Sequence, residues 1–224
     1  MRFNRLFRYC ASLALAAGAI ATAQQPEPKV GEEPKPAVKD ANAIPSTFRS
    51  FIVLDKRTDA KDPLNRTNKI HCLVCENNLN PVVAVFSRSQ PGKEPGADDP
   101  LSKLTVGLAK LVAVDKYKAQ NFASFLIFAT LDKEFQSDDK RDLYAAAIKS
   151  WGEAVGAGGV VLGLTGQGSE AVKNWNLEKD NDITVVLYNR MKMVQKPWTF
   201  AEGKMTEADV KAVLTAAEAE LGKK

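Results

Sequence analysis

Short apolar runs alternate with amphipathic helical stretches along most of this 224-residue chain, and no other feature restricts its fold as strongly. The runs at 82–86, 122–131 and 160–164 are apolar at most positions, which is typical of strands covered on both faces. Consecutive parallel strands need helical crossovers. The alternation therefore predicts an α/β domain with a central, mostly parallel sheet and helices on both of its faces.

The expected helices have recognisable starts. Asp99 is a capping residue, and Pro100 after it fits the first position of a helix. Ser137 occupies the same place ahead of the next stretch with helical spacing. Thr206 and Asp209 have the spacing of a capping box and open the last helix. These signals predict a helix after each of the first two apolar runs and another at the C-terminus.

Four further segments are predicted as strands at the flanks of the sheet. Residues 48–54 and the short segment 70–75 come before the central strands. Residues 183–189 and 192–198 are expected to form a hairpin. Pro197 assigns the second strand of this hairpin to an edge, because proline cannot donate to a ladder. The sheet is therefore expected to end in an antiparallel edge hairpin.

The first 23 residues have the pattern of an export signal. Arginines in the first eight residues precede an apolar core at 9–20, and residues 21–23 form a small-x-small site with cleavage expected before Gln24. The apolar core is shorter than the roughly 20 residues that span a bilayer. We therefore expect a signal peptide at 1–23, a secreted or periplasmic protein, and no membrane span after cleavage.

Residues 24–46 contain prolines among Glu, Lys and Ala and almost no large apolar side chains. Such a segment cannot bury enough surface to fold, so it is predicted to be a disordered Pro-rich linker ahead of a folded domain at 47–224. Removal of the signal also removes its three arginines and lowers the net charge from +4 to +1. The remaining chain lacks the excess of positive charge that is typical of nucleic-acid-binding proteins.

Two cysteines are the clearest candidates for chemistry. Cys10 leaves with the signal, so Cys72 and Cys75 are the remaining thiols of the exported chain. A pair of cysteines in an exported protein predicts a disulfide.

The order of the predicted elements resembles the thioredoxin fold, and within it the longer peroxiredoxin-like and TlpA-like thiol proteins. In that family a strand such as 82–86 leads into a loop and a helix, another strand–helix unit follows, and a hairpin and a helix close the domain. Residues 163–177 resemble the extra strand and short helix of the longer members, and Cys72 and Cys75 have the C-x-x-C spacing. The resemblance implies a thioredoxin-like three-layer sandwich that exchanges disulfides through this pair.

Two positions depart from the pattern of that family. In thioredoxins the cysteine pair follows the central strand, whereas here it precedes the strand 82–86. Residues 87–91, after the strand, contain no cysteine, and peroxiredoxin chemistry would need one near there. The stretch 180–184 also lacks the proline that faces the cysteines in thioredoxins. The missing cysteine argues against a peroxidase, and the missing proline, which peroxiredoxin-like members also lack, bears on reductase activity.

Three interpretations of the cysteine pair stay open at the level of sequence. Cys72 and Cys75 could form a structural disulfide, a short-loop redox couple, or half of a metal site together with His71. Glu76 next to the pair disfavours a thiolate, whereas a protonated His71 would favour one. We predict an exported protein that exchanges disulfides with other exported proteins. The alternative is a non-catalytic binding or structural module stapled by the pair. No cofactor, resident metal or nucleic-acid partner is expected.

Overall fold

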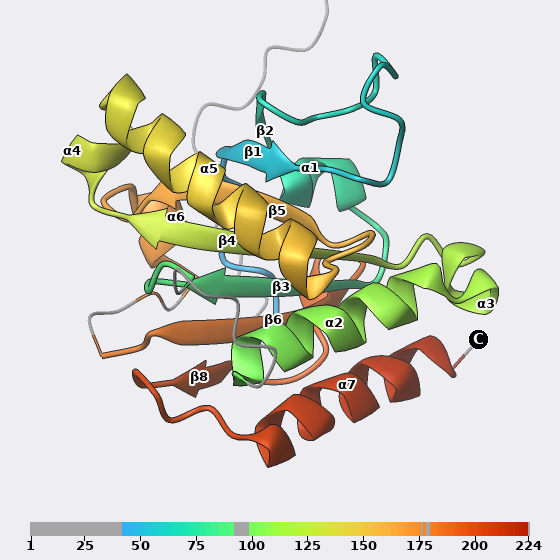
Figure 1. Ribbon diagram of the computed structural model, residues 1–224. Helices are drawn as coiled ribbons and strands as arrows, with labels where there is room; N and C mark the ends of the chain where they lie inside the picture. The colour runs from blue at the N-terminus through green and yellow to red at the C-terminus, as the bar shows by residue number, and fades with distance from the viewer. Residues whose placement is uncertain (1–41, 92–98, 176, 178–179, 224) are drawn as a thin grey trace, which may run out of the picture. The chain divides into compact units, whose positions relative to one another are not determined.

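One mixed sheet runs through the part of the chain that the structure describes. The structure is a computed structural model and describes residues 42–91, 99–175, 177 and 180–223 (Figure 1). The sheet order is β2-β1-β5-β4-β3-β6-β7, and β8 also pairs with β6. The strands are β1 Ser50–Leu54, β2 Ile70–His71, β3 Val82–Ser87, β4 Ala123–Thr130, β5 Val161–Gly166, β6 Ile183–Asn189, β7 Lys192–Met193 and β8 Trp198–Phe200. The predicted signal peptide and residues 24–41 of the predicted linker lie outside the described residues.

The centre of the sheet is parallel and its flanks are antiparallel. β4 lies between β3 and β5 and runs parallel to both, with Val82 opposite Ala123 and Phe125 opposite Val161. β6 is antiparallel to β3, and β1 is antiparallel to β5. The predicted α/β class is therefore confirmed, including its parallel centre and its antiparallel edge.

Helices cover both faces of the sheet. They are α1 Leu73–Asn77, α2 Pro100–Ala113, α3 Asp115–Lys118, α4 Asp132–Phe135, α5 Asp138–Val155, α6 Glu170–Lys173 and α7 Glu207–Leu221. Figure 1 shows the long helices α2, α5 and α7 on one face, where their apolar side chains pack in a single cluster with the sheet. A second cluster on the other face includes buried side chains of α1, α6 and the segment before β1. The three-layer arrangement follows from these two clusters.

The predicted helix starts agree with the structure except in one detail. The Asp99 carboxylate accepts a hydrogen bond from the Ser102 amide at 3.0 Å, and Thr206 and Asp209 form the expected capping box. Ser137 is in the N-cap position of α5, but its side chain makes no capping hydrogen bond. Gly156 ends α5 in the left-handed conformation, with φ of 75°, which glycine adopts without steric cost.

The prediction of a strand over 70–75 is wrong beyond His71. The strand β2 ends at His71, and the chain turns into the short helix α1 with Cys72 in the N-cap position. The Cys72 sulfur accepts a hydrogen bond from the Cys75 amide at 3.1 Å, which fixes the first turn of α1. The sequence of this segment did not indicate the turn, because the pattern of apolar residues cannot distinguish a strand from one helical turn over so few residues.

The second hairpin strand, predicted over 192–198, is interrupted in the structure. β7 covers Lys192–Met193 and β8 begins at Trp198, so residues 194–197 belong to neither strand. Pro197 has no amide hydrogen to donate, which is consistent with the break directly before β8. On the outer side of β7, the Met193 amide donates to the Asn42 carbonyl at 2.6 Å. The described chain thus contacts the sheet from Asn42 onward.

Candidate functional site

The two cysteines form a disulfide at the start of α1. The Cα atoms of Cys72 and Cys75 are 5.3 Å apart. Cys72 is partly buried, whereas Cys75 is exposed to solvent. The bond therefore lies at the surface rather than within the core.

The inward side of α1 holds this turn in place. Leu73 and Val74, between the cysteines, are almost fully buried in the second apolar cluster. One turn later, the Asn77 side-chain amide donates to the Leu73 carbonyl at 2.8 Å and is buried as well. Residues three or four apart lie on the same side of a helix. Leu73, Val74 and Asn77 are buried and form the inner side of α1, so Cys75 lies on its outer side.

Glu76 connects this turn to the long loop between β1 and β2. Its carboxylate lies 3.0 Å from the Arg57 guanidinium and 3.9 Å from that of Arg66. The His71 Nε2 atom lies 2.6 Å from the same carboxylate, although the two are not aligned as a hydrogen bond. Sequence reasoning identified Glu76 as a negative neighbour of the cysteines but not these two arginines. The structure shows that their positive charges largely compensate Glu76.

Arg57 is itself fixed by a buried acid. Two guanidinium nitrogens of Arg57 donate to the two carboxylate oxygens of Asp55, at 2.9 and 2.8 Å. The Asp55 side chain is only 1% exposed. Burial alone would raise the pKa of Asp55, but the hydrogen bonds and the positive charge of Arg57 outweigh it and lower that pKa. The same ion pair raises the pKa of Arg57 against the opposing effect of burial.

A hollow of 740 Å³ opens beside the disulfide. Residues from the segment before β1, from β2 and from the first turn of α1 line it: Thr47, Phe48, Arg49, Ile70, His71, Cys72, Cys75 and Glu76. Arg49 is exposed, and Ile70 is 62% exposed. A solvent-open hollow against a surface disulfide gives an incoming thiol room to approach the exposed Cys75.

The metal interpretation finds no support in the arrangement of these donors. Within the described residues, no group of three or more His, Cys, Asp or Glu side chains is placed to hold a metal ion. Cys72 and Cys75 are bonded to each other, and His71 faces Glu76. His71 therefore belongs to the charged network beside the disulfide.

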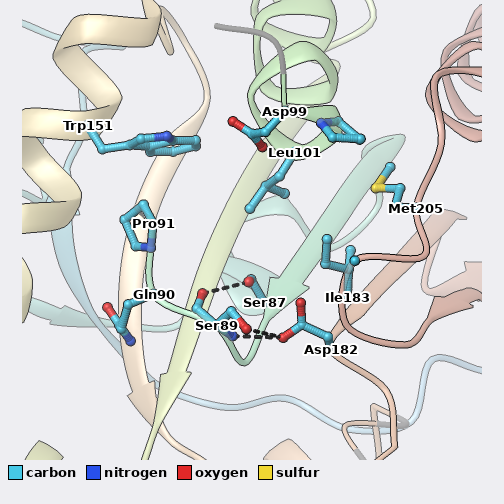
Figure 2. Close-up of a pocket in the computed structure, with 12 residues that line it drawn as sticks. Ser87, Ser89, Gln90, Pro91, Asp99, Leu101, Trp151, Asp182, Ile183 and Met205 are labelled. Carbon is cyan, nitrogen blue, oxygen red and sulfur yellow. Dashed lines mark hydrogen bonds between the residues drawn. The ribbon is translucent and has the colours of Figure 1, made fainter. Parts of the chain in front are cut away.

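A second cavity, of 380 Å³, lies at the carboxyl end of β3, the position that carries the cysteines in thioredoxins (Figure 2). Its floor contains Ser87, Ser89 and Asp182. The Ser89 hydroxyl and amide both donate to one Asp182 oxygen, at 2.6 and 2.9 Å, and the Ser87 hydroxyl donates to the Ser89 carbonyl at 2.8 Å (Figure 2). The pair Ser89 and Asp182 is separated by 93 residues, and sequence reasoning did not identify it.

Apolar side chains form the walls of this cavity. They come from α2, α5, β6 and the loop before α7, and they include Leu101, Trp151, Ile183 and Met205. Trp151 is 4% exposed and packs edge-on against Phe128, with ring centroids 5.7 Å apart. The cavity offers a binding surface but no sulfur nucleophile, because no cysteine lines it.

Comparison with known proteins finds distant structural similarity only. No family model and no curated protein sequence matches it. Among solved structures, a mutant of peroxiredoxin Q from Xanthomonas campestris is 13% identical, with a TM-score of 0.47, and the match covers 80% of this chain and 99% of that one. Reduced Prx3 from Vibrio vulnificus in complex with hydrogen peroxide is 15% identical, with a TM-score of 0.43 and coverage of 80% and 94%. Copper-bound ScoI from Arabidopsis thaliana is 11% identical, with a TM-score of 0.44 and coverage of 79% and 99%.

The architecture of this chain, a sheet with a parallel centre and helices on both faces, agrees with the thioredoxin-like three-layer sandwich that the sequence resemblance implied. At such low identities no functional residue is transferred from these structures. The site rests instead on the geometry of this chain, in which a surface disulfide between Cys72 and Cys75 fits thiol redox chemistry. Within the described residues, no helix is both long and apolar enough to cross a membrane.

Proposed function

We propose that this chain exchanges disulfides with other exported proteins through Cys72 and Cys75. The observation that carries the proposal is the surface disulfide in the first turn of α1, whose second cysteine is exposed beside an open hollow. A catalytic sulfur must be reachable by its partner, whereas a purely structural one need not be. This chemistry requires no cofactor.

The geometry favours an order for the two cysteines. A partner thiolate attacks the exposed Cys75 sulfur, a bond forms between the two, and the Cys72 sulfur leaves with the electron pair of the broken bond. The Cys75 amide already donates to the Cys72 sulfur at 3.1 Å, so it is placed to stabilise the departing thiolate. A second partner thiolate then attacks the partner sulfur of the mixed disulfide. Overall, two partner thiols become a disulfide while Cys72 and Cys75 become thiols.

Measurement of the reduction potential tests this function. The purified protein is equilibrated in graded redox buffers with metal chelated, and free thiols are trapped and counted. A midpoint between about −120 and −270 mV, the range of oxidoreductases, is the expected result. A midpoint below roughly −300 mV would mark a structural disulfide and contradict the proposal.

Order of attack is tested with two single variants. Cys72→Ser retains the exposed Cys75, whose thiolate attacks a partner disulfide and releases one partner sulfur as a thiolate. The mixed disulfide is expected to accumulate, since Cys72, which would attack it, is gone. Cys75→Ser retains the partly buried Cys72 and should accumulate fewer. Equal yields of mixed disulfide from the two variants would contradict the assigned order.

We also propose that the protein acts outside the cytoplasm, in the periplasm or after secretion. The support is the signal-like segment 1–23 and the even cysteine pair. Expression of the full chain in a bacterial host, followed by mass spectrometry of the extracytoplasmic fraction, tests this localisation. The expected product begins at Gln24, and an uncleaved cytoplasmic product would contradict it.

A second candidate function, ligand binding, is favoured by the cavity at the end of β3. In open α/β sheets, ligands bind beyond the carboxyl ends of the strands, and this cavity combines apolar walls with a few converging polar groups. Under this alternative the disulfide is a staple. Reduction would then lower the melting temperature, and neither single cysteine variant would trap a partner.

A further inference from the structure

The hollow beside the disulfide contains a cation that is not used within the fold. Arg49 lines the hollow and is exposed, and its guanidinium forms no ion pair or hydrogen bond with any described residue. The neighbouring guanidinium groups of Arg57 and Arg66 are instead directed to Asp55 and Glu76. Arg49 is therefore available to something that enters the hollow.

The acid in the hollow does not cancel this charge. Glu76 lies within 4 Å of two guanidinium groups and in contact with His71. Asp55 is paired with Arg57 and lies inside the fold rather than in the hollow. The charge that remains at the mouth of the hollow is thus that of Arg49. Such a surface attracts anions, and a guanidinium matches the geometry of a carboxylate especially well.

An exposed apolar side chain lies on the same rim. Ile70, in the edge strand β2, is 62% exposed, although it lines the hollow together with the cysteines. A small carboxylated thiol could form an ion pair with Arg49, but it would leave Ile70 exposed to solvent. A segment of polypeptide can contact both, because consecutive residues of an extended chain reach about 3.3 Å apart.

We infer that the partner of this disulfide is an acidic protein segment in which the reacting cysteine lies next to an Asp or Glu and an apolar residue. The inference rests on the proposed function. In the complex, the partner carboxylate pairs with Arg49, the apolar residue covers Ile70, and the partner thiolate attacks Cys75 as described above. The electron balance is unchanged, with two partner thiols oxidised for each disulfide reduced.

The test compares three synthetic peptides with one cysteine each, flanked by Asp and Leu, by Asn and Leu, or by Lys and Leu. The rate of reduction of the protein disulfide is measured for each at low salt, and again for dithiothreitol, which carries no charge. Each peptide rate is corrected for the thiolate fraction of that peptide. We expect the acidic peptide to react about five- to tenfold faster than the basic one, a ratio typical of a single exposed ion pair.

Two variants and one condition locate the origin of that ratio. Arg49→Gln should reduce the ratio of acidic to basic rates towards one, and so should high salt, which screens exposed charges. Lys211→Gln removes another exposed positive charge, from α7 on the opposite face of the sheet, and should leave the ratio unchanged. Using a ratio removes any effect of a variant on the intrinsic reactivity of the disulfide.

Each failure has a distinct meaning. Equal rates for the three peptides, with ready reduction by dithiothreitol, would overturn the acidic partner and leave the exchange function standing. A ratio that survives Arg49→Gln would show that the preference arises elsewhere and would also overturn the inference. Glutathione serves as a further reductant. If it reacts as fast as the acidic peptide, the partner is a small carboxylated thiol and the inferred protein segment is wrong. A disulfide that neither peptide nor dithiothreitol reduces would overturn the proposed function itself.

Discussion

The hollow beside the disulfide and the cavity at the end of β3 differ in charge, in the exposure of their lining residues and in their position on the sheet. The hollow lies at the edge strand β2, and charged groups surround an exposed sulfur. The cavity lies beyond a central strand, and its walls are buried aromatic and aliphatic side chains. They also lie at opposite ends of β3, because α1 leads into its amino end at Val82 whereas the cavity begins at Ser87.

The difference shows that the disulfide and the long helices of this fold depend on separate sets of packing contacts. Packing of α2, α5 and α7 over the parallel strands needs only the apolar cluster on that face. The cysteine pair on the other face depends on the first turn of α1, which the buried Leu73 and Val74 hold in place, and on the ion pair between Arg57 and Glu76. Changes to one region are therefore expected to leave the other intact, and four predictions test this separation, from the largest effect to the smallest.

The largest effect is expected from loss of both sulfurs. The double variant Cys72→Ser and Cys75→Ser should lose disulfide exchange completely, since no other cysteine is present in the described residues. Its free energy of unfolding should fall by about 2 kcal/mol at most, because the disulfide closes a very short loop. Insulin reduction and urea denaturation measure the two quantities. Retained exchange would contradict the proposed site, and a much larger loss of stability would favour a structural staple.

A core substitution should have the opposite profile. Phe128→Ala removes a fully buried ring that packs on Trp151 and should lower the free energy of unfolding by about 4 kcal/mol. Exchange measured well below the melting temperature should stay at the wild-type rate, because Phe128 belongs to the cluster on the far side of the sheet. A matched loss of exchange in the folded variant would break the proposed separation.

Arg57→Gln should affect the loop that supports the disulfide. It leaves the buried Asp55 carboxylate without its partner, so we expect a loss of about 3 kcal/mol at pH 7. Because Arg57 lowers the pKa of Asp55 in the folded state, the stabilisation is present above the unfolded value of 3.8 and is lost as the pH falls through the lower folded pKa. The difference between wild type and variant should therefore shrink at acid pH.

Denaturation at pH 7 and pH 3 measures this dependence. Lys56→Gln, which removes the adjacent exposed cation, is the control and should change stability by less than about 0.5 kcal/mol at either pH. A deficit of the Arg57 variant that is equal at both pH values would show that the ion pair with Asp55 is not its cause.

The smallest effect is expected from Glu76→Gln. The substitution removes a negative charge beside the disulfide, so Arg66 loses its carboxylate partner while Arg57 keeps Asp55. An attacking thiolate is an anion, so its reaction with the disulfide should become about two- to threefold faster at low salt. Glu202→Gln, at an exposed turn before α7, is the matched control and should leave the rate unchanged. A slower reaction of the Glu76 variant would mean that Glu76 acts in exchange rather than opposing it.

The sequence predicted most of the fold because its signals are local. The three apolar runs correspond to β3, β4 and β5, and Asp99, Thr206 and Asp209 cap the helices they were expected to cap. A capping hydrogen bond spans only three residues, so its partners can be found by spacing alone. The disulfide between Cys72 and Cys75 was predicted on another ground, as the pair of cysteines that remains in an exported chain.

The charge network and the cavity were decided by tertiary structure. Arg57 and Glu76 meet only because β2 returns the loop to α1, and Asp182 meets Ser89 only because β6 pairs with β3. Even the helical start at Cys72 depends on burial of Leu73 and Val74 against distant side chains. The sequence by itself thus determined the α/β elements and the paired cysteines. The charged groups around the disulfide and the groups lining the cavity are brought together only by strand pairing in the sheet. Contacts between residues far apart in the chain leave no periodic pattern in the sequence, so the sequence alone could not predict them.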